Sequence, residues 1–362
     1  MQNLSLAILS ALIYFSAAHA GELNMSELQK PPTPIPADMP KLSPLLADAD
    51  GKPISTQAEW LKRRDELKRQ WQEFLGPFPQ DRGPLDAKIS DTEDLPEFTR
   101  YHVTYRIEDG ILTDGYVLTP KNVPAGTLLP AMVVFHPTVK THAKEPSGVE
   151  DVSPDRIERQ HGLQLVKRGY LVLCPRCYLF DDGADVKGNT AKVLEKHPEW
   201  KGMARMTYDG LRAADYLCSL RNVDKNRIGC MGHSLGAKET LYAAAFDERY
   251  KVAVFSEGGI GISFSNWEAN WYLGPKVKAP GFALDHHQVM AFIAPRSFLI
   301  LAGESADNDK SWAYIDAVLP VYKLFNAPEQ LGWLDHRKGH TYPPNAEAAA
   351  ESVIDRALKT AK

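Results

Sequence analysis

The sequence has no large excess of charge of either sign. Of its 362 residues, 42 are Lys or Arg and 46 are Asp or Glu, which gives a formal net charge of −4. A protein that binds nucleic acid by neutralising phosphates is strongly basic, and a disordered chain is poor in hydrophobic residues, whereas 44% of these residues are hydrophobic. The composition therefore predicts a globular protein and excludes nucleic acid as a partner.

Long hydrophobic runs are missing after residue 20. Residues 1–20 carry no Lys, Arg, Asp or Glu, contain an apolar stretch too short to span a bilayer, and end in Ala18-His19-Ala20, a pattern that signal peptidase accepts. We expect a signal peptide here, although the usual basic residue at its start is missing; a buried helix or membrane anchor is the alternative. No later run approaches the roughly 18 apolar residues of a membrane span. We therefore expect a soluble, exported protein, periplasmic or secreted.

Cysteine is scarce, and the patterns of metal and nucleotide sites are absent. The cysteines are Cys174, Cys177, Cys218 and Cys230. The first two have the spacing of a redox motif, but no helix start follows them, and no second CxxC or HxxxH completes a zinc site. A GxGxxG loop is also missing. We expect no metal and no cofactor, and the sequence leaves disulfide pairing open.

The chain divides into a short leading part and a longer catalytic part. After residues 1–20, residues 21–97 are expected to form a proline-rich extended arm and then an amphipathic helix over residues 56–75, which Gly76-Pro77 ends. Residues 98–362 are expected to form the catalytic domain.

Strand-like and helix-like runs alternate in that domain. A hairpin is predicted over 98–118, followed by strands at 131–136, 170–174, 227–232, 252–256 and 298–302, and helices at about 154–167, 203–220, 235–246 and 311–325. Such alternation predicts an α/β fold with a mostly parallel sheet covered by helices on both faces.

Gly232-His233-Ser234-Leu235-Gly236 forms a GxSxG motif between a predicted strand and a predicted helix. That context is typical of a nucleophilic serine on a sharp turn, where the glycines keep neighbouring atoms clear. We expect Ser234 to be the nucleophile, with an ordinary strand-to-helix turn as the alternative. The N–H of Leu235, at the start of the helix, is then a candidate oxyanion donor.

A nucleophilic serine needs a histidine to take its proton and a carboxylate to orient that histidine. Both are expected downstream of Ser234. His340 lies in a loop before the last helix, which favours it as the base, and His336 is the reserve. His286 and His287 precede a helix-like run and are expected to pack or to cap a helix.

Two carboxylates are candidates for the acid. Asp307 follows the predicted strand at 298–302, and Glu257 follows the one at 252–256, so either can reach a histidine at adjacent strand ends. We favour Asp307 and keep Glu257; solvated loop carboxylates are the alternative for both.

The second oxyanion donor is expected after an earlier strand, in His136-Pro137-Thr138. Because Pro137 has no N–H, we expect the backbone of Thr138 or its neighbour to donate. His136 either lines the pocket or forms a hydrogen bond within the loop.

From about residue 98 to the end, the sequence resembles α/β-hydrolases. It is most similar to the carbohydrate esterases that cleave esters of uronic acids, namely glucuronoyl esterases and related bacterial pectin methylesterases. The nucleophile region, the stretch from Asp285 through Ala294-Pro295-Arg296 and the run Pro320–Leu324 carry this resemblance. It implies an α/β-hydrolase fold and ester hydrolysis by an acyl-enzyme.

The resemblance also implies roles for individual residues. Lys238, four residues after Ser234, matches a lysine that contacts the uronate, and Glu257 matches the acid of some bacterial members. The sequence departs at Leu235, where those enzymes have an arginine. Gly236 instead completes the GxSxG of ordinary esterases and dienelactone-hydrolase-like proteins, which leaves uronate methyl esters as plausible substrates.

The residues themselves suggest how a sugar would bind. A cation at Lys238, one helical turn beyond Ser234, would meet a substrate carboxylate or hydroxyl; pairing with Glu239 or Asp247 is the alternative. Trp267 and Trp271 lie in an aromatic-rich loop and either stack on sugar faces or anchor the loop.

The sequence thus predicts an exported serine carboxylesterase that acts on plant polysaccharide, with a uronic acid methyl ester as the first choice. An acetyl-xylan esterase or dienelactone-hydrolase-like esterase is the alternative, and a non-catalytic sugar-binding protein is a distant one. Because the net charge is −4, an anionic polysaccharide would have to bind through local cations and aromatic stacking.

Overall fold

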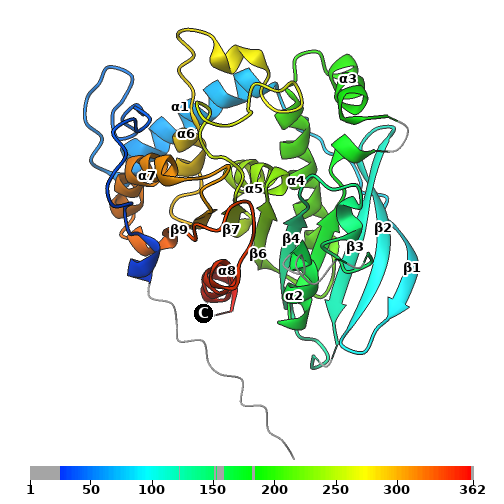
Figure 1. Ribbon diagram of the computed structural model, residues 1–362. Coiled ribbons are helices and arrows are strands. Elements are labelled where there is room, and N and C mark those ends of the chain that lie inside the picture. The colour runs from blue at the N-terminus through cyan, green and yellow to red at the C-terminus, as the bar shows by residue number, and fades with distance from the viewer. Residues whose placement is uncertain (1–24, 122, 151, 153–158, 182–183, 360–362) are drawn as a thin grey trace, which may run out of the picture.

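The computed structural model describes residues 25–121, 123–150, 152, 159–181 and 184–359, and a nine-stranded sheet runs through it (Figure 1). The strands are β1 (Lys88–Asp94), β2 (Phe98–Glu108), β3 (Ile111–Pro120), β4 (Leu129–Phe135), β5 (Leu171–Pro175), β6 (Val223–His233), β7 (Tyr250–Ser256), β8 (Ser297–Ala302) and β9 (Leu331–Asp335). Their order across the sheet is β1-β2-β3-β5-β4-β6-β7-β8-β9. The three strands β1 to β3 pair antiparallel, β3 also pairs antiparallel with β5, and all pairs from β5 to β9 are parallel.

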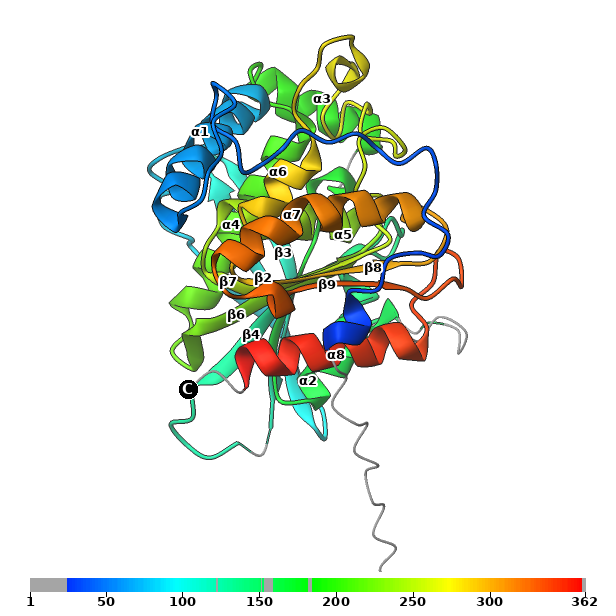
Figure 2. The same cartoon turned by 90° about the vertical axis from the view of Figure 1, so that its left-hand side faces the viewer.

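Helices cover both faces of the sheet, as Figure 2 shows with the sheet nearly edge-on. They are α1 (Gln57–Leu75), α2 (His161–Lys167), α3 (Val186–Lys196), α4 (Gly202–Ser219), α5 (Leu235–Phe246), α6 (His286–Ala291), α7 (Trp312–Leu324) and α8 (Pro344–Leu358). Two hydrophobic clusters correspond to the two faces: the larger joins α1, α4, α5, α6 and α7 to the sheet, and the smaller joins α2 and α8 to it. The predicted α/β class is confirmed.

The parallel strands are buried because their sequences are apolar on both sides. Every residue of β4, β5 and β8 is buried, which is what a strand covered by helices on both faces requires. By contrast, every residue of β1 is exposed. Its sequence, KISDTED, has none of the alternation that marks a half-buried strand, and so the sequence did not predict it.

The segment before residue 98 is packed on the domain. Thr56 caps α1 with a reciprocal capping box to Glu59, and Trp60 and Trp71 of α1 are fully buried. The proline-rich arm runs over α7 in Figure 2. Because β1 pairs with β2, the boundary expected after residue 97 falls between two neighbouring strands of one sheet.

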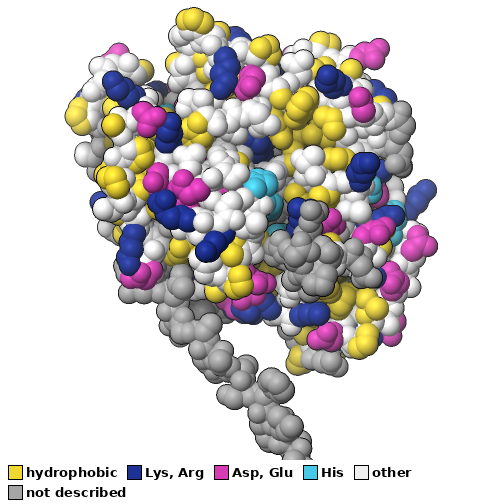
Figure 3. All heavy atoms as spheres, viewed as in Figure 1, with side chains coloured by type: hydrophobic (Ala, Val, Ile, Leu, Met, Phe, Trp, Pro, Cys, Tyr) yellow, Lys and Arg dark blue, Asp and Glu magenta, His cyan; other side chains and the backbone are white. Residues whose placement is uncertain are grey.

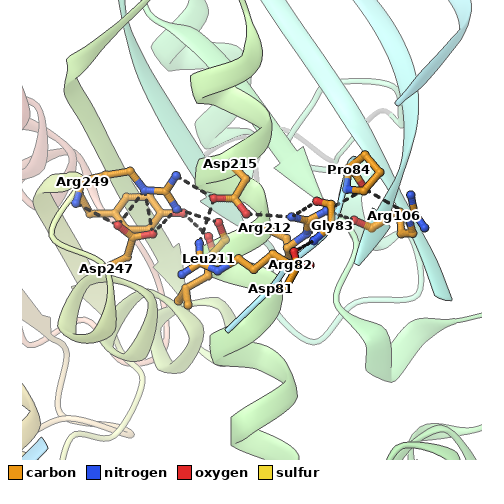
Figure 4. A network of polar contacts seen from close by, with 12 residues as sticks. Asp81, Arg82, Gly83, Pro84, Arg106, Leu211, Arg212, Asp215, Asp247 and Arg249 are labelled. Atoms are coloured by element: carbon orange, nitrogen blue, oxygen red, sulfur yellow. Dashed lines mark hydrogen bonds and ion pairs between the residues drawn. The ribbon is translucent and has the colours of Figure 1, made fainter. Parts of the chain in front are cut away.

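A network of arginines fastens the chain between α1 and β1 to the sheet (Figure 4). The buried Arg212 of α4 donates to the carbonyl of Arg106 at 2.8 Å and pairs with Asp215 at 2.9 Å. Asp215 also pairs with Arg82 at 3.0 Å and with Arg249 at 2.8 Å. This cluster holds the segment before β1 in place and lies apart from the GxSxG turn.

The expected signal peptide, residues 1–20, lies outside the described residues. Among the helices that the structure describes, none has the length and apolar character of a membrane span.

All four cysteines carry free thiols. Burial raises the pKa of the Cys174 and Cys177 thiols, which disfavours the thiolate that redox chemistry requires.

Candidate active site

Ser234 forms the sharp turn between β6 and α5. Its backbone has φ 58° and ψ −115°, a conformation that costs a non-glycine residue about 1–3 kcal/mol. A Cβ at Gly232 would overlap the backbone of Gly236, and a Cβ at Gly236 would overlap the carbonyl oxygen of Phe135. Both glycines of the motif are therefore required by close packing, and the turn has the geometry of a nucleophile elbow.

Backbone N–H groups lie next to Ser234 on the helix side. Leu235 is the first residue of α5, so its N–H has no acceptor within the helix. The loop after β4 passes beside Gly236, and Thr138 lies exposed in that loop. The loop that carries Thr138 therefore starts beside the helix that Leu235 begins.

His340 and Glu257 meet at the carboxyl edge of the sheet. The Nδ1 of His340 lies 3.1 Å from Oε2 of Glu257. The Glu257 carboxylate is fully buried, whereas the His340 side chain is 42% exposed. In the space-filling view, histidine reaches the surface near the centre of this face (Figure 3). A buried carboxylate thus contacts one nitrogen of an imidazole that solvent can reach.

The Glu257 carboxylate is held by the turn after β8. The N–H of Gly303 donates to Oε1, and the N–H of Ala306 donates to Oε2 at 2.9 Å. The loop that carries His340 is fastened to the same turn, because the N–H of Gly339 donates to the carbonyl of Gly303 at 2.6 Å. Gly303 therefore positions both members of the pair.

Asp307, the acid that the sequence favoured, does not contact His340. Its carboxylate accepts the N–H of Gly259 at 2.7 Å, the N–H of Ile260 at 2.8 Å and the hydroxyl of Ser311 at 2.8 Å. Burial, together with the nearby Glu257, raises the pKa of Asp307 to about 6. The preference for Asp307 over Glu257 is corrected here, because the partner of Asp307 beyond these backbone groups is Ser311, whereas His340 lies against Glu257.

The Ser234 hydroxyl does not cap α5. Catalytic hydrogen bonds are often long without substrate and tighten when it binds.

His233, which the sequence did not single out, packs its ring 4.6 Å from that of His340 and bonds to the hydroxyl of Ser256 at 2.9 Å. Its place inside the GxSxG motif was the only signal in the sequence.

The other candidate histidines have different partners. The Nδ1 of His336 accepts the N–H of Lys338 at 3.2 Å, and burial lowers the pKa of His336. His286 and His287 are buried in α6, as a packing role requires. The imidazole of His136 is fully buried, donates from Nδ1 to the carbonyl of Pro137 at 2.7 Å and accepts the N–H of Cys177 at 3.0 Å. The bond to Pro137 is the contact within the loop that one of the two alternatives for His136 expects.

Lys238 is almost completely buried in the first turn of α5. Its Nζ donates to the hydroxyl of Ser265 at 3.2 Å and lies 3.7 Å from the ring centroid of Trp267. Burial lowers the pKa of Lys238 to about 7. The alternative pairing with Glu239 or Asp247 at a helix surface is therefore wrong.

The two tryptophans expected to stack on sugar differ in exposure. Trp267 is fully buried, and its Nε1–H donates to the carbonyl of Gly259 at 2.7 Å. Trp271 is half-buried, and its backbone lies against Gly202 of α4. Trp267 is therefore a loop anchor in this structure, and the sequence could not distinguish the two because both lie in the same aromatic run.

One acidic group could attract a cation. Among the described residues, carboxylate oxygens of Glu304, Asp309 and Asp335 approach within 4.8 Å of one another. The guanidinium of Arg337 lies 3.3 Å from Glu304, 2.6 Å from Asp309 and 3.5 Å from Asp335. A side-chain cation already occupies the position between these carboxylates.

The strand order and the serine on a strand-to-helix elbow define an α/β-hydrolase. Residues 113–283 match the model of the Dienelactone hydrolase family. The chain is also 26% identical over 139 residues to Carbohydrate esterase MZ0003 from an unknown prokaryotic organism, a match that covers 34% of this chain and 31% of that esterase. The matched region therefore spans less than a third of the curated relative's own length.

Solved structures share this fold. A glucuronoyl esterase from Solibacter usitatus aligns with a TM-score of 0.73 and 21% identity over 89% of this chain and all of its own. Methylesterase BT1017 aligns with a TM-score of 0.62 and 16% identity over 84% of this chain and 65% of its own. The predicted resemblance to α/β-hydrolase carbohydrate esterases is confirmed, and the family match and the esterase relatives support a carboxylic ester hydrolase.

Proposed function

We propose that this chain is a serine carboxylesterase in which Ser234 is the nucleophile, His340 the general base and Glu257 the acid of the triad. One observation carries the proposal: Nδ1 of His340 lies 3.1 Å from the buried Glu257 carboxylate, at the strand edge where β6 presents Ser234. A serine, a histidine and a carboxylate at one edge of the sheet are what ester hydrolysis by an acyl-enzyme needs.

Each residue has a defined step in this mechanism. Ser234 Oγ attacks the ester carbonyl while Nε2 of His340 accepts its proton, and Glu257 holds the imidazole by Nδ1–H and stabilises its cationic form. The N–H of Leu235 and a backbone N–H at Thr138 stabilise the tetrahedral oxyanion. The imidazolium returns the proton to the leaving alkoxide. Water then attacks the acyl-enzyme with His340 again as base and releases the acid and Ser234.

The substrate that we propose is an ester on plant polysaccharide, with a uronic acid methyl ester first. The resemblance to glucuronoyl esterases and the likeness to a methylesterase support this choice. Lys238, one helical turn beyond Ser234, supplies a local cation in a chain whose net charge is −4. Export through the signal peptide at 1–20 would bring the enzyme to such a substrate.

A neutral ester, such as the acetyl group of an acetylated xylan, is the second candidate. A specific observation favours it: Lys238 is buried beneath Ser265 and Trp267, and its lowered pKa, about 7, leaves the ammonium only partly charged at neutral pH. Such a lysine attracts a uronate less strongly than an exposed one does.

Product release separates these candidates. Wild type and Ser234→Ala are incubated with methyl-esterified pectin and with acetylated xylan, and methanol and acetate are measured; Ser90→Ala, on the exposed edge strand, is the matched control. We expect methanol release by wild type and by the control, and none above background by Ser234→Ala. Acetate without methanol would move the substrate to the acetyl ester. Equal release by wild type and Ser234→Ala would refute the mechanism.

A fluorophosphonate probe addresses the non-catalytic alternative. An activated serine should be labelled in wild type and in Ser90→Ala but not in Ser234→Ala, whereas a sugar-binding protein without an activated serine would not be labelled at all.

Export has its own test. The N-terminus of the protein recovered from the periplasm or medium of an expressing bacterium should be Gly21. A protein that retains residues 1–20 after export would contradict the cleavage site.

A further inference from the structure

Buried side chains form hydrogen bonds with the backbone of the turn that follows Glu257. They bind both the N–H and the carbonyl groups of Gly259 and Ile260. Residues 258–260 continue directly from Glu257 at the end of β7. The N–H groups of Gly259 and Ile260 donate to Asp307. The carbonyl of Gly259 accepts the Nε1–H of Trp267 at 2.7 Å, and the carbonyl of Ile260 bonds to Nδ1 of His286 at 2.7 Å. Four backbone groups are thus fixed by three side chains.

Of these three side chains, His286 contacts the end of the turn, at the carbonyl of Ile260. It begins α6 and is fully buried. Because a carbonyl only accepts, Nδ1 must carry the proton that binds Ile260, and Nε2 then accepts the hydroxyl of Tyr242 at 2.9 Å. Burial lowers the pKa of His286 to about 3, so this neutral tautomer persists across the pH range of an esterase.

Aromatic rings lock the imidazole of His286 in place. Its ring stacks on Trp71 at a centroid distance of 5.7 Å and lies 4.1 Å from Trp267. Tyr242 meets it edge-on at 5.6 Å. The donor at Nδ1 is therefore presented to Ile260 by a rigid surrounding and not by a mobile side chain.

The backbone of Glu257 needs such support. Its φ is 51°, a left-handed value that persists in a non-glycine residue only where the surroundings impose it. The bond from its own N–H to the carbonyl of Leu301, at 2.9 Å, fixes the side toward β7. The other side is the turn 258–260, which His286, Trp267 and Asp307 fix.

We propose that His286 is a positioning residue for the reaction: by donating Nδ1–H to the carbonyl of Ile260, it sets the place of the Glu257 carboxylate and, through it, the imidazole of His340. The inference rests on the triad of the proposed function. A displacement of about 1 Å in a catalytic group costs on the order of 100-fold in rate, so a group outside contact with the substrate controls kcat in this way.

Two substitutions of similar size separate the positioning role from simple packing. Asn at 286 places an amide N–H near the position of Nδ1 and keeps the donor to Ile260, but it loses the acceptor for Tyr242. Gln at 286 places an amide oxygen near the position of Nε2 and keeps the acceptor for Tyr242, but it loses the donor to Ile260. Both remove the aromatic ring, so both lose comparable packing.

The neighbouring residue provides a control. His287 lies in the same helix and is equally buried, but it bonds to Ser43 of the arm at 3.1–3.2 Å. His287→Gln therefore perturbs α6 without touching the turn 258–260. Trp267→Phe is a milder variant that removes the bond to Gly259 and keeps a smaller aromatic ring beside His286 and Lys238.

The test is steady-state hydrolysis of 4-nitrophenyl acetate by the full chain at 25 °C, with melting temperatures recorded for every variant. We expect His286→Gln to lower kcat by about 10-fold or more relative to His286→Asn, with KM within about twofold, and His287→Gln to keep the wild-type kcat. If either variant at 286 fails to fold, Trp267→Phe decides, with a kcat about 3–10-fold below wild type. Equal kcat for His286→Gln and His286→Asn, or an unchanged kcat for Trp267→Phe where that variant decides, would overturn the proposal. Ser234→Ala, measured beside them, distinguishes this outcome from failure of the triad, which full activity of Ser234→Ala would show.

Discussion

The turn after β7 and the turn after β8 carry one buried carboxylate each, and the two carboxylates have different partners. Glu257 and Asp307 are both fully buried and both accept two backbone N–H groups. The third partner of Glu257 is the imidazole of His340, whereas that of Asp307 is the hydroxyl of Ser311. The comparison teaches that position at a strand end does not assign the acid; the third partner does.

The two turns also hold each other. The N–H groups that bind Glu257 come from Gly303 and Ala306, after β8, and those that bind Asp307 come from Gly259 and Ile260, after β7. Each carboxylate is therefore fixed by the backbone of the other's turn. This exchange lets two acids lie close together in a buried place, because hydrogen bonds to the charged form offset part of the repulsion.

Glu257→Gln removes the charge of the carboxylate that contacts His340 and should have the largest effect. The amide cannot stabilise the imidazolium, so we expect kcat on 4-nitrophenyl acetate to fall by about 10³–10⁴-fold with little change in KM. Stopped assays at high enzyme concentration measure this loss. A kcat within tenfold of wild type would show that another group orients His340.

Gly303→Ala breaks the connection between the turns. A Cβ at Gly303 would overlap the carbonyl of Gly339 and the ring of His336, which displaces the His340 loop and the N–H that binds Glu257. We expect kcat to fall by about 100-fold and the melting temperature to drop. Wild-type values for both would contradict the close approach of these loops.

Asp307→Asn affects the other carboxylate. The amide keeps the shape of Asp307 but presents an N–H₂ group to one of its backbone donors. We expect a loss of about 1–3 kcal/mol in the free energy of unfolding and a fall in kcat of about tenfold or less, since His340 keeps its partner. Urea denaturation and the same ester assay measure both. A loss of activity as large as that of Glu257→Gln would restore Asp307 as the acid.

The pH dependence of stability should show the smallest effect. Folding raises the pKa of Asp307 from an ordinary 3.8 to about 6, so the folded state binds more protons than the unfolded state between these values. This contribution to stability is full below pH 4 and is lost as the pH rises to about 6. The stability of wild type relative to Asp307→Asn should therefore decline between pH 4 and 6 in urea titrations. A difference that stays constant or grows over this range would contradict the assignment.

The sequence was sufficient for elements that local pattern determines. The apolar spacing of Trp60 and Trp71 and the stop at Gly76-Pro77 placed α1 within one residue. The elbow at Ser234 follows from two glycines that only this tight turn requires. The alternation of buried strands and helices likewise gave the α/β fold before any contact was known.

Features that depend on distant contacts were not readable in the same way. The choice between Glu257 and Asp307 depends on which turn approaches the His340 loop, and hydrogen bonds spanning more than 40 residues decide it. The burial of Trp267 depends on Gly259 and His286. The catalytic roles of Ser234, His340 and Glu257 stay predictions until they are measured.

The proposed triad depends most on the hydrogen bond between His340 and Glu257. Proton NMR observes this bond most directly, through the imidazole N–H resonance at the deshielded end of the spectrum. We predict a strongly deshielded imidazole N–H resonance in wild type that persists in Asp307→Asn and disappears in Glu257→Gln and in His340→Ala. A resonance that survives in Glu257→Gln but is lost in Asp307→Asn would contradict the assignment and make Asp307 the acid.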